Sequence, residues 1–434
     1  MMEYVSNKSF KKFLIIWFGE FVSSIGSGLT AFALAVYVFQ MTGTATSVSL
    51  VILFSFLPSI LLSPVAGVLA DRFDRRLMMI IGDSLSALGL LFIFLIMATG
   101  EIALWQICLG VTISSIFIAL LEPSYKATIT DLLTEEQFSK ASGLVQLAAS
   151  SKYLFSPIIA GFLLTVTNTE TILIIDISTF FVTVLTVMFV KRNLQVMKKK
   201  QERHNFLKSL VEGWYAVKEN GFVMYLIMII SLVTFFIGFV QTLLTPMMLS
   251  LTDVKMLGII QSFSSIGLII SSLIIGIFVI STKYTKQLVI GLGFAGYFIS
   301  MMGLTTNIYF IGGAIFLLFA ALPFVNTSAE VLIRKTIENE KQGRAWGIIG
   351  IISQLGYVVA YSISGLLADN VFNPLLVEGG ALASTIGRVI GTGQGRGIGL
   401  LFIISGMMVV LLAVITYKNK SIKLYENPIP VQQG

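Results

Sequence analysis

Four ionisable residues lie inside long apolar segments, where a charge is expensive and usually serves a function. Three are acids, Glu20, Asp83 and Asp176, and the fourth is Lys152. Glu20 follows Lys12 by eight residues, which places it about 12 Å into a membrane on a helix that rises ~1.5 Å per residue. A buried carboxylate can bind a proton, because protonation removes a desolvated charge. The sequence therefore predicts these four residues as candidates for proton coupling.

Residues that build metal sites and hydrolytic centres are nearly absent. The chain has one histidine, His204, and one cysteine, Cys108. That is too few for a zinc site, an intrachain disulfide or a histidine-based catalytic triad. We therefore expect no metal and no cofactor, and we do not expect an enzyme.

The segments that carry the four residues are long and apolar. Of the 434 residues, 56% are hydrophobic and 12% are charged, with a mean hydropathy of +0.91, whereas soluble proteins contain about 25% charged residues. Runs long enough to cross a bilayer as helices recur along the chain. We place them at 13–39, 47–70, 77–99, 103–124, 140–165, 171–190, 222–250, 256–281, 288–305, 308–333, 345–368 and 397–417. The sequence predicts an all-α membrane protein with twelve transmembrane helices.

The twelve runs fall into two sets of six. The longest strongly charged segment separates them, so we expect an N-terminal bundle at 1–190, a cytoplasmic linker at 191–221, and a C-terminal bundle with a cytoplasmic tail at 222–434.

A weak internal repeat favours two pseudo-symmetric six-helix bundles. A shift of 209 residues aligns Gly67 with Gly276 and Gly82 with Gly291. A shift of 204 residues aligns the Gly161 segment with its counterpart at Gly365.

Basic residues are distributed asymmetrically between the runs. Of the 29 lysines and arginines, 25 lie in the termini and in the loops of one side. The opposite loops hold Lys255, Arg388 and Arg396. The positive-inside rule then places both termini in the cytoplasm and the protein in the cell membrane as a multi-pass chain. This distribution also explains the net charge of +7 without a nucleic-acid partner.

A charged loop between the second and third runs is the most distinctive motif. It consists of Gly67, Asp71, Arg72, Arg75 and Arg76. Because so many charges cannot lie in hydrocarbon, the loop belongs at a membrane surface. Its three arginines place it at the cytoplasmic surface. We expect Gly67 to permit a close backbone approach. The alternative is a plain hairpin turn with positive-inside charges.

This loop resembles the signature loop of the major facilitator superfamily, which usually has glycine where this chain has Asp74. The resemblance implies two bundles that alternate access to a midplane site. It also implies that the loop clamps the cytoplasmic ends of the two halves and stabilises the outward-facing state. In that fold the first and fifth spans are neighbours, so we expect a Glu20–Lys152 pair in one state. The alternative is a static buried pair that only fixes the packing of the two helices.

A second partial match lies in the fifth run at Ser156, Pro157, Ala160 and Gly161. It resembles the antiporter motif of the superfamily, in which proline kinks the helix; a passive kink is the alternative. The stretch from Glu122 to Pro157 further resembles the macrolide-efflux branch of the drug:proton antiporters, and so does the glycine-rich outer loop that ends at Gly397.

Mixed aromatic and polar residues on the later runs suit a cavity for an amphiphilic compound. The substrate-cavity candidates are Phe235, Gln241, Phe316, Asn326, Gln354 and Tyr357. Helix packing or lipid contact is the alternative for the phenylalanines. Two further pairs, Glu122 with Lys126 and Glu330 with Arg334, have the i,i+4 spacing of local ion pairs.

Together, the residues and the resemblance lead us to expect a secondary active transporter, functional as a monomer in the lipid bilayer. It would export amphiphilic organic compounds, drug-like or macrolide-like, in exchange for protons. The alternative on the same fold is an exporter of a siderophore or a translocator of a lysophospholipid.

Overall fold

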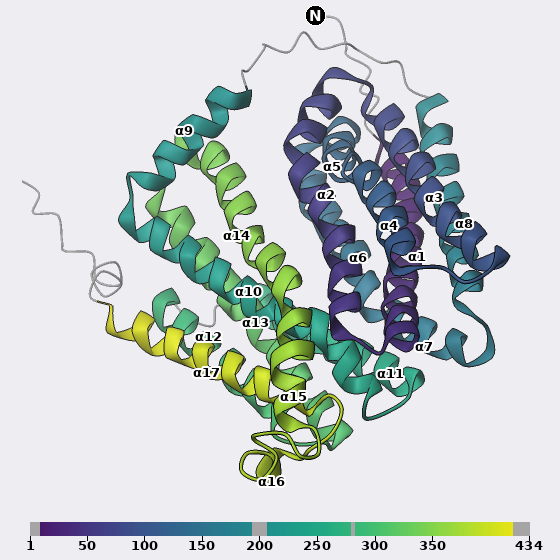
Figure 1. Cartoon of the computed structure of the whole chain (residues 1–434). Coiled ribbons are helices and arrows are strands. Elements are labelled where there is room, and N and C mark those ends of the chain that lie inside the picture. The colour runs from purple at the N-terminus through teal and green to yellow at the C-terminus, as the bar shows by residue number, and fades with distance from the viewer. Residues whose placement is uncertain (1–8, 193–205, 279–282, 420–434) are drawn as a thin grey trace, which may run out of the picture. The chain divides into compact units, whose positions relative to one another are not determined.

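The computed structural model describes residues 9–192, 206–278 and 283–419. These residues form helices joined by short turns, with no β-strand among them. The first helices (Figure 1) are α1 (Phe10–Thr42), α2 (Ala45–Arg72), α3 (Arg75–Thr99), α4 (Leu104–Ile118), α5 (Leu121–Leu132), α6 (Phe138–Leu154), α7 (Ser156–Val166) and α8 (Thr169–Arg192).

The remaining helices follow the undescribed residues 193–205. They are α9 (Phe206–Lys218), α10 (Gly221–Leu249), α11 (Val254–Ile277), α12 (Tyr284–Gly303), α13 (Ile308–Thr336), α14 (Asn339–Leu367), α15 (Asn373–Leu376), α16 (Gly387–Ile390) and α17 (Arg396–Lys418). The helix α9 lies within the segment that the sequence suggests as a linker, and it packs against α14 and α10.

Eleven helical stretches in the described residues are long and apolar enough to span a membrane. Two of them are interrupted helices, Leu104–Leu132 (α4 and α5) and Glu135–Val166 (a short 3₁₀ turn, α6 and α7). The helix α12 is not among the eleven, although its 20 residues match the roughly 20 that a bilayer requires. The fold is therefore an all-α membrane fold, and the count of twelve spans stays an expectation.

The chain divides into two compact units. The first comprises Met1–Gly43, Leu50–Glu202 and Val254–Ser262, and the second comprises Thr44–Ser49, Arg203–Asp253 and Phe263–Gly434. The division differs from the expected boundaries in two short segments, Thr44–Ser49 and Val254–Ser262. Each is the amino end of a helix that otherwise belongs to the other unit.

The first unit is built around α1. This helix packs against α8 on one side and against α6 and α7 on the other, while α3 packs against α4 and α8. Trp17 on α1 donates its indole N–H to the carbonyl of Leu144 on α6, at 2.6 Å. Two apolar clusters fill the unit, one around Ile93 and Phe180 and one around Phe13 and Met79.

The second unit contains two tightly packed groups of helices. The helix α12 lies between α13 and α17, and α10 lies along α14. Glycines allow the closest approaches: a Cβ added at Gly303 would lie 2.0 Å from the carbonyl oxygen of Gly399, and one at Gly296 would lie 2.6 Å from that of Gly406.

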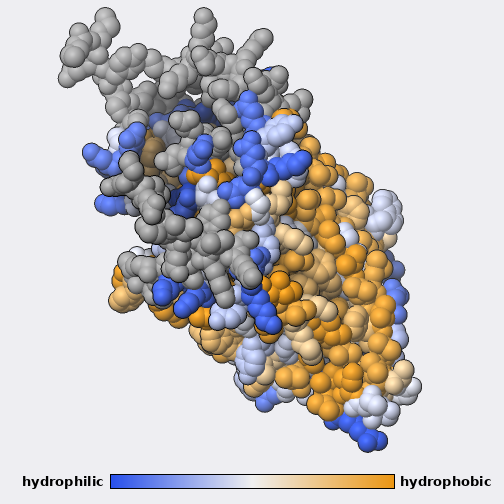
Figure 2. All heavy atoms as spheres, turned by 90° about the vertical axis from the view of Figure 1, so that its left-hand side faces the viewer, coloured by the Kyte–Doolittle hydropathy of each residue, from blue (hydrophilic) through white to orange (hydrophobic). Residues whose placement is uncertain are grey.

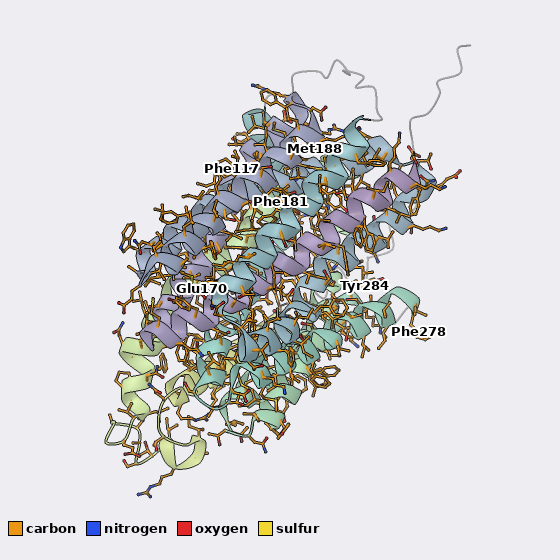
Figure 3. The ribbon with its side chains drawn as sticks, turned by 90° about the vertical axis from the view of Figure 1, so that its right-hand side faces the viewer. Phe117, Glu170, Phe181, Met188, Phe278 and Tyr284 are labelled. Atoms are coloured by element: carbon orange, nitrogen blue, oxygen red, sulfur yellow. The ribbon has the colours of Figure 1, made fainter. Side chains whose placement is uncertain are left out.

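Large apolar side chains remain exposed on the outer faces of the helices. On α8, Phe181 and Met188 lie on one exposed face, and Glu170 lies near the other end of the helix (Figure 3). Met407, Leu411 and Ile415 continue the pattern on α17. Figure 2 shows hydrophobic residues over much of the described surface in that view. Such surfaces are stable in hydrocarbon and unstable in water.

Candidate functional site

Three acids from three helices of the first unit form the site, which we call the acid cluster. They are Glu20 on α1, Asp83 on α3 and Asp176 on α8. Asp83 and Asp176 are each 1% exposed, and the charge of Asp83 interacts with those of Glu20 and Asp176. Ionisable side chains inside a membrane-spanning helix cost free energy and usually serve a function. Three such acids in one unit therefore indicate a functional site.

The hydrogen bonds available to the acid cluster leave it partly unsatisfied. In the described residues, the Oε1 of Glu20 and the Oδ2 of Asp83 are buried and meet no donor. Asp176 Oδ1 accepts a hydrogen bond from the hydroxyl of Thr179 at 3.4 Å, and the hydroxyl of Thr30 lies beside it. The buried hydroxyl of Tyr125 on α5 lies near Glu20. An unpartnered buried carboxylate oxygen is costly when it is charged and much less so when it is protonated.

Lys152 on α6 interacts electrostatically with Asp176. The expected pair of Glu20 with Lys152 is not formed in this structure, where Glu20 Oε1 meets no partner among the described residues. One lysine can balance one of the three acids. The cluster therefore approaches electrical neutrality when it also holds protons.

Glycines on α1 bring the acids together. A Cβ added at Gly26 would lie 2.3 Å from Thr179 Oγ1 and 2.6 Å from Asp176 Oδ1, and one at Gly19 would lie 2.4 Å from Thr186 Oγ1. One at Gly28 would lie 2.8 Å from the carbonyl oxygen of Lys152. Because these positions lack side chains, α8 and α6 can approach α1 closely enough for their ionisable residues to interact. These glycines were not among the predicted site residues, although their spacing in a polar stretch of α1 marks them in the sequence.

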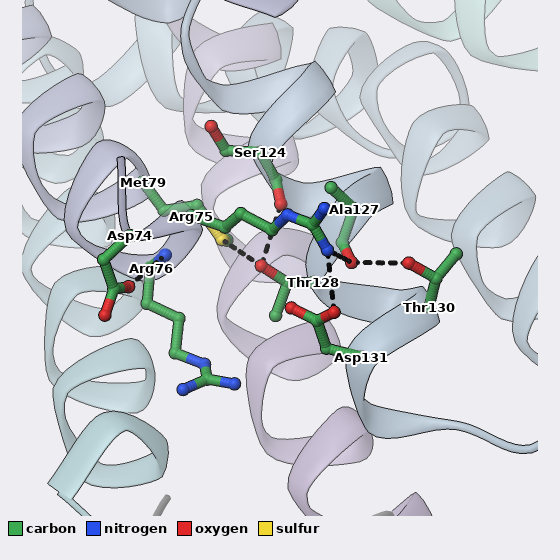
Figure 4. A network of polar contacts seen from close by, with 9 residues as sticks. All are labelled: Asp74, Arg75, Arg76, Met79, Ser124, Ala127, Thr128, Thr130 and Asp131. Carbon is green, nitrogen blue, oxygen red and sulfur yellow. Dashed lines mark hydrogen bonds and ion pairs between the residues drawn. The ribbon is translucent and has the colours of Figure 1, made fainter. Parts of the chain in front are cut away.

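The signature loop forms a polar network at the junction of α2 and α3 (Figure 4). Asp74 caps α3, since its Oδ1 accepts hydrogen bonds from the backbone N–H groups of Arg76 at 2.9 Å and Leu77 at 3.2 Å. Arg75 reaches α5, where its Nη1 lies 2.7 Å from Asp131 Oδ1 and 3.0 Å from the carbonyl of Ala127. The residue that departs from the usual glycine thus stabilises the start of a helix.

The other members of the loop differ in exposure. Asp71 and Arg72 are exposed at the end of α2, whereas Arg76 is buried, with an Nε that meets no partner in the described residues. A Cβ added at Gly67 would have no atom within 4 Å. The close backbone approach expected at Gly67 is therefore absent from this structure.

The partial antiporter motif lies where the fifth spanning segment is interrupted. The helix α6 ends at Leu154, and α7 starts at Ser156 with Pro157 in its first turn, where proline is tolerated because its missing N–H has no helical partner there. Ser156 donates its hydroxyl to the carbonyl of Ile25 on α1, at 2.9 Å. Ala160 and Gly161 are buried. The motif ties α7 to α1, the helix that carries Glu20.

The substrate-cavity candidates lie in the second unit, on α10, α13 and α14. Tyr361 joins two of them: its hydroxyl donates to Gln241, and its ring stacks on Tyr357 with centroids 5.7 Å apart. Phe235 packs edge-on against Phe239 at 4.8 Å. These contacts group α10 and α14 residues on one aromatic and polar surface.

Phe316 and Asn326 occupy α13 and have other neighbours. Phe316 stacks on Phe263 of α11 with centroids 4.9 Å apart. Asn326 is exposed, as are Gln241 and Gln354, although all three lie within spanning helices. Exposed amides at that depth are typical of faces that line a water-filled cavity.

Glu330, Arg334 and Arg396 differ from expectation. The i,i+4 pair of Glu330 with Arg334 is not formed; Arg334 lies over the ring of Trp346, 5.9 Å from its centroid. Arg396, placed by the sequence in an outer loop, is the first residue of α17 and 1% exposed. The Glu122–Lys126 pair is formed, at 2.6 Å.

Comparison with known proteins agrees with this architecture. Macrolide efflux protein A of Streptococcus pyogenes is 28% identical over 83% of this chain and 90% of that protein. Multidrug resistance protein MdtG of Proteus mirabilis is 24% identical over 84% of this chain and 91% of that protein.

Solved transporters share the fold at low identity. The nucleoside transporter NupG superposes with a TM-score of 0.69 at 15% identity, covering 94% of this chain and all of that one. An inward-facing bacterial homologue of the lysosomal transporter Spinster superposes with a TM-score of 0.71 at 12% identity, covering 97% of this chain and all of that one. The model of the Major Facilitator Superfamily matches residues 16–252. The chain belongs to the Major Facilitator Superfamily, with the all-α fold of its membrane transporters.

Proposed function

We propose that this protein exports amphiphilic organic compounds, macrolides among them, in exchange for protons. The observation that carries the proposal is the acid cluster, in which the half-buried Glu20 and the buried Asp176 both interact with the buried Asp83, and Asp176 also interacts with Lys152. The relatives named for macrolide efflux and multidrug resistance support the direction of transport and the class of substrate.

Glu20 is our candidate for the coupling acid. It lies on α1 beside the hydroxyl of Tyr125 and within electrostatic range of Asp83. A proton on Glu20 removes a charge from a site of low dielectric, and losing that proton restores the cost. Protonation can therefore shift the balance between two conformations of the transporter. Asp83 and Asp176 also bind protons in this proposal, and the positive charge of Lys152 offsets the negative charge of Asp176.

The aromatic and polar surface of the second unit is our candidate for substrate contact. Its rings offer stacking to apolar parts of a large molecule, and its exposed amides offer hydrogen bonds. Phe235, Tyr357, Gln241 and Gln354 are the residues that we assign to it, with Phe316 and Asn326 on α13. We further propose that both termini are cytoplasmic, as the distribution of basic residues favours, and that a monomer is sufficient for transport.

The test is accumulation of labelled erythromycin in a pump-deficient bacterium, with and without a protonophore. We expect the expressed protein to lower accumulation, and we expect the protonophore to abolish that effect. Glu20→Gln should lose export against a gradient but retain exchange of erythromycin down its own gradient. Glu101→Gln is the matched control, because Glu101 is an exposed acid just beyond α3.

The outcomes separate the alternatives. Protonophore-insensitive export would contradict the coupling. Failure to export a broad panel of amphiphilic drugs, together with translocation of a lysophospholipid in vesicles, would contradict the substrate class. A Glu20→Gln protein that pumps like the unmodified one would exclude Glu20 and leave Asp83 and Asp176 as candidates.

A further inference from the structure

The amino end of α2 is held by the carboxyl end of α14 within the second unit. Thr44–Ser49 belongs to that unit, while α2 from Leu50 onward belongs to the first. The helix thus passes from one unit to the other after a single turn. Thr44–Ser49 is therefore held by contacts within the second unit, next to the point at which α2 enters the first.

One carboxylate makes three of the polar contacts that hold this segment. Asp369, in the π-helical turn that follows α14, accepts hydrogen bonds from the backbone N–H of Ala45 at 3.1 Å and of Thr46 at 2.8 Å. It also accepts one from the hydroxyl of Thr46, at 2.7 Å. The first N–H groups of a helix have no partner within the helix, and the positive end of the helix dipole favours a negative charge there. Asp369 lies more than 300 positions from α2 in the sequence, and it supplies both the hydrogen-bond acceptors and the negative charge at the amino end of that helix.

A buried chain of hydroxyl groups continues the contact inward. Ser49 Oγ lies 3.1 Å from Ser364 Oγ, which in turn lies 2.7 Å from Thr242 Oγ1 on α10. The three residues are 2%, 0% and 0% exposed. If the amino end of α2 left α14, Ser49 and Ser364 would lose their hydrogen bond to each other, whereas Ser364 would keep Thr242 as a partner.

Gly365 makes the approach of the two helices possible. A Cβ added there would lie 2.4 Å from the Cα of Thr46 and 2.7 Å from Ser49 Oγ. We name this contact, formed by Thr46, Ser49, Ser364, Gly365 and Asp369, the α2 dock.

The internal repeat supplies an independent comparison. Under the shifts of 204 and 209 residues, Gly365 corresponds to Gly161, and Thr46 corresponds to Lys255. Gly161 also packs closely against the segment around Lys255. A Cβ added at Gly161 would lie 3.0 Å from the carbonyl oxygen of Val254 and 3.2 Å from the Cα of Gly258. The position equivalent to Asp369 is Thr165, which donates to the carbonyl of Phe162 in its own helix. The two halves therefore repeat the glycine contact, and the position that is Asp369 in the second half is Thr165 in the first.

We propose that Asp369 is a positioning residue for transport: it latches the amino end of α2 onto α14, and each transport cycle requires this latch to open. The inference rests on the proposed function for the transport cycle itself. The latch acts through α2, and Asp369 need not touch the substrate.

The first test measures opening of the dock without any substrate. In a Cys108→Ala background, Ser49→Cys places a thiol in the buried contact, and a membrane-impermeant maleimide reports its exposure. Adding Asp369→Asn replaces one accepting oxygen with an amide nitrogen and removes the charge. We expect labelling to become about fivefold faster, the change expected from losing one helix cap of ordinary strength. Glu378→Gln is the matched control, because Glu378 is an exposed acid in the segment that follows, and it should leave labelling unchanged.

The second test locks the dock. The side chains of Thr46 and Asp369 meet at 2.7 Å, so Thr46→Cys with Asp369→Cys in the same background should form a disulfide on oxidation. We expect oxidation to abolish erythromycin export and a reductant to restore it. This double variant also covers the case in which Asp369→Asn fails to fold.

Equal labelling with and without Asp369→Asn would overturn the proposal, as would unchanged export by the oxidised double variant. Failure of the unmodified protein to export erythromycin would contradict the proposed substrate, while the labelling rates would still decide whether Asp369 holds the dock closed.

Discussion

At the scale of single residues, the acid cluster depends as much on residues without side chains as on its carboxylates. Ionisable residues inside apolar runs were visible in the sequence, and this is why Glu20, Asp83, Asp176 and Lys152 could be selected. Their mutual distances were not visible, because they follow from how α1, α3, α6 and α8 pack. Lys152 illustrates the limit, since its charge acts on Asp176 in the structure, whereas the depth of both residues and the adjacency of the first and fifth spans in the resembled fold pointed to Glu20.

Gly26 provides a direct test of this dependence. Gly26→Ala would place a methyl group 2.6 Å from Asp176 Oδ1 and 2.3 Å from Thr179 Oγ1, so both side chains must move. We expect a loss of about 1–3 kcal/mol of stability, as is usual for overpacking, together with impaired energised export. Thermal unfolding in detergent and erythromycin accumulation measure the two effects.

Gly143→Ala is the matched control for that change. Gly143 is also helical, and a Cβ there would meet no atom within 4 Å. We expect unchanged or slightly higher stability, because alanine is the better helix former. Equal behaviour of the two variants would contradict the role of Gly26.

Asp74, which stands where the superfamily usually has glycine, can be tested for a local role in stability. Asp74→Ala removes the acceptor of two backbone N–H groups at the start of α3. A lost helix cap of this kind costs about 1 kcal/mol. We expect lower thermal stability with export retained per folded molecule. A complete loss of export at unchanged stability would instead assign Asp74 a part in transport.

At the scale of elements, hydropathy predicted the spanning segments well, because long apolar runs have few other stable conformations. Hydropathy did not predict the interruption between α4 and α5 or the burial of Arg396, whereas Pro157 indicated the break between α6 and α7. In the structure, Arg396 donates to the carbonyls of Gly303 at 2.6 Å and Thr305 at 3.0 Å, at the carboxyl end of α12. A helix carboxyl end carries partial negative charge, so backbone carbonyls more than 90 residues away pair with both terminal nitrogens of this cation. Such partners leave no mark in the residue pattern around Arg396.

The α2–α3 junction carries the prediction that belongs to this scale. Asp71 is exposed at the end of α2, so Asp71→Asn should not disturb the packing of either helix. If the signature loop clamps the cytoplasmic ends in the outward-facing state, the substitution should cut export strongly while expression and erythromycin binding stay near normal. Export rate and equilibrium binding on the same preparation decide the matter, and export at the unmodified rate would refute the clamp.

At the scale of the whole molecule, the two units carry different chemistry. The acid cluster belongs to the first unit, and the aromatic and polar surface assigned to substrate belongs to the second. The weak repeat predicted two related halves, and the paired glycine contacts at Gly161 and Gly365 are consistent with it. The repeat could not predict that the acids lie in one unit and the aromatic and polar surface in the other, because the two halves differ in their ionisable residues.

The division predicts that two kinds of kinetic defect can be separated. Gln354 is exposed on α14 within a spanning helix, so Gln354→Leu should remove a hydrogen bond to substrate and leave the proton path intact. One hydrogen bond of ordinary net strength corresponds to a rise in KM of about two- to tenfold. Glu20→Gln should instead remove the dependence of export on a pH gradient and leave the KM for exchange nearly unchanged. Initial rates in proteoliposomes, with the erythromycin concentration and the imposed pH gradient varied separately, measure both quantities for each variant. If Gln354→Leu abolished the response to the pH gradient, or if Glu20→Gln raised only the KM, coupling and substrate recognition would not be divided between the two units, and the assignment of the second unit to substrate would fail.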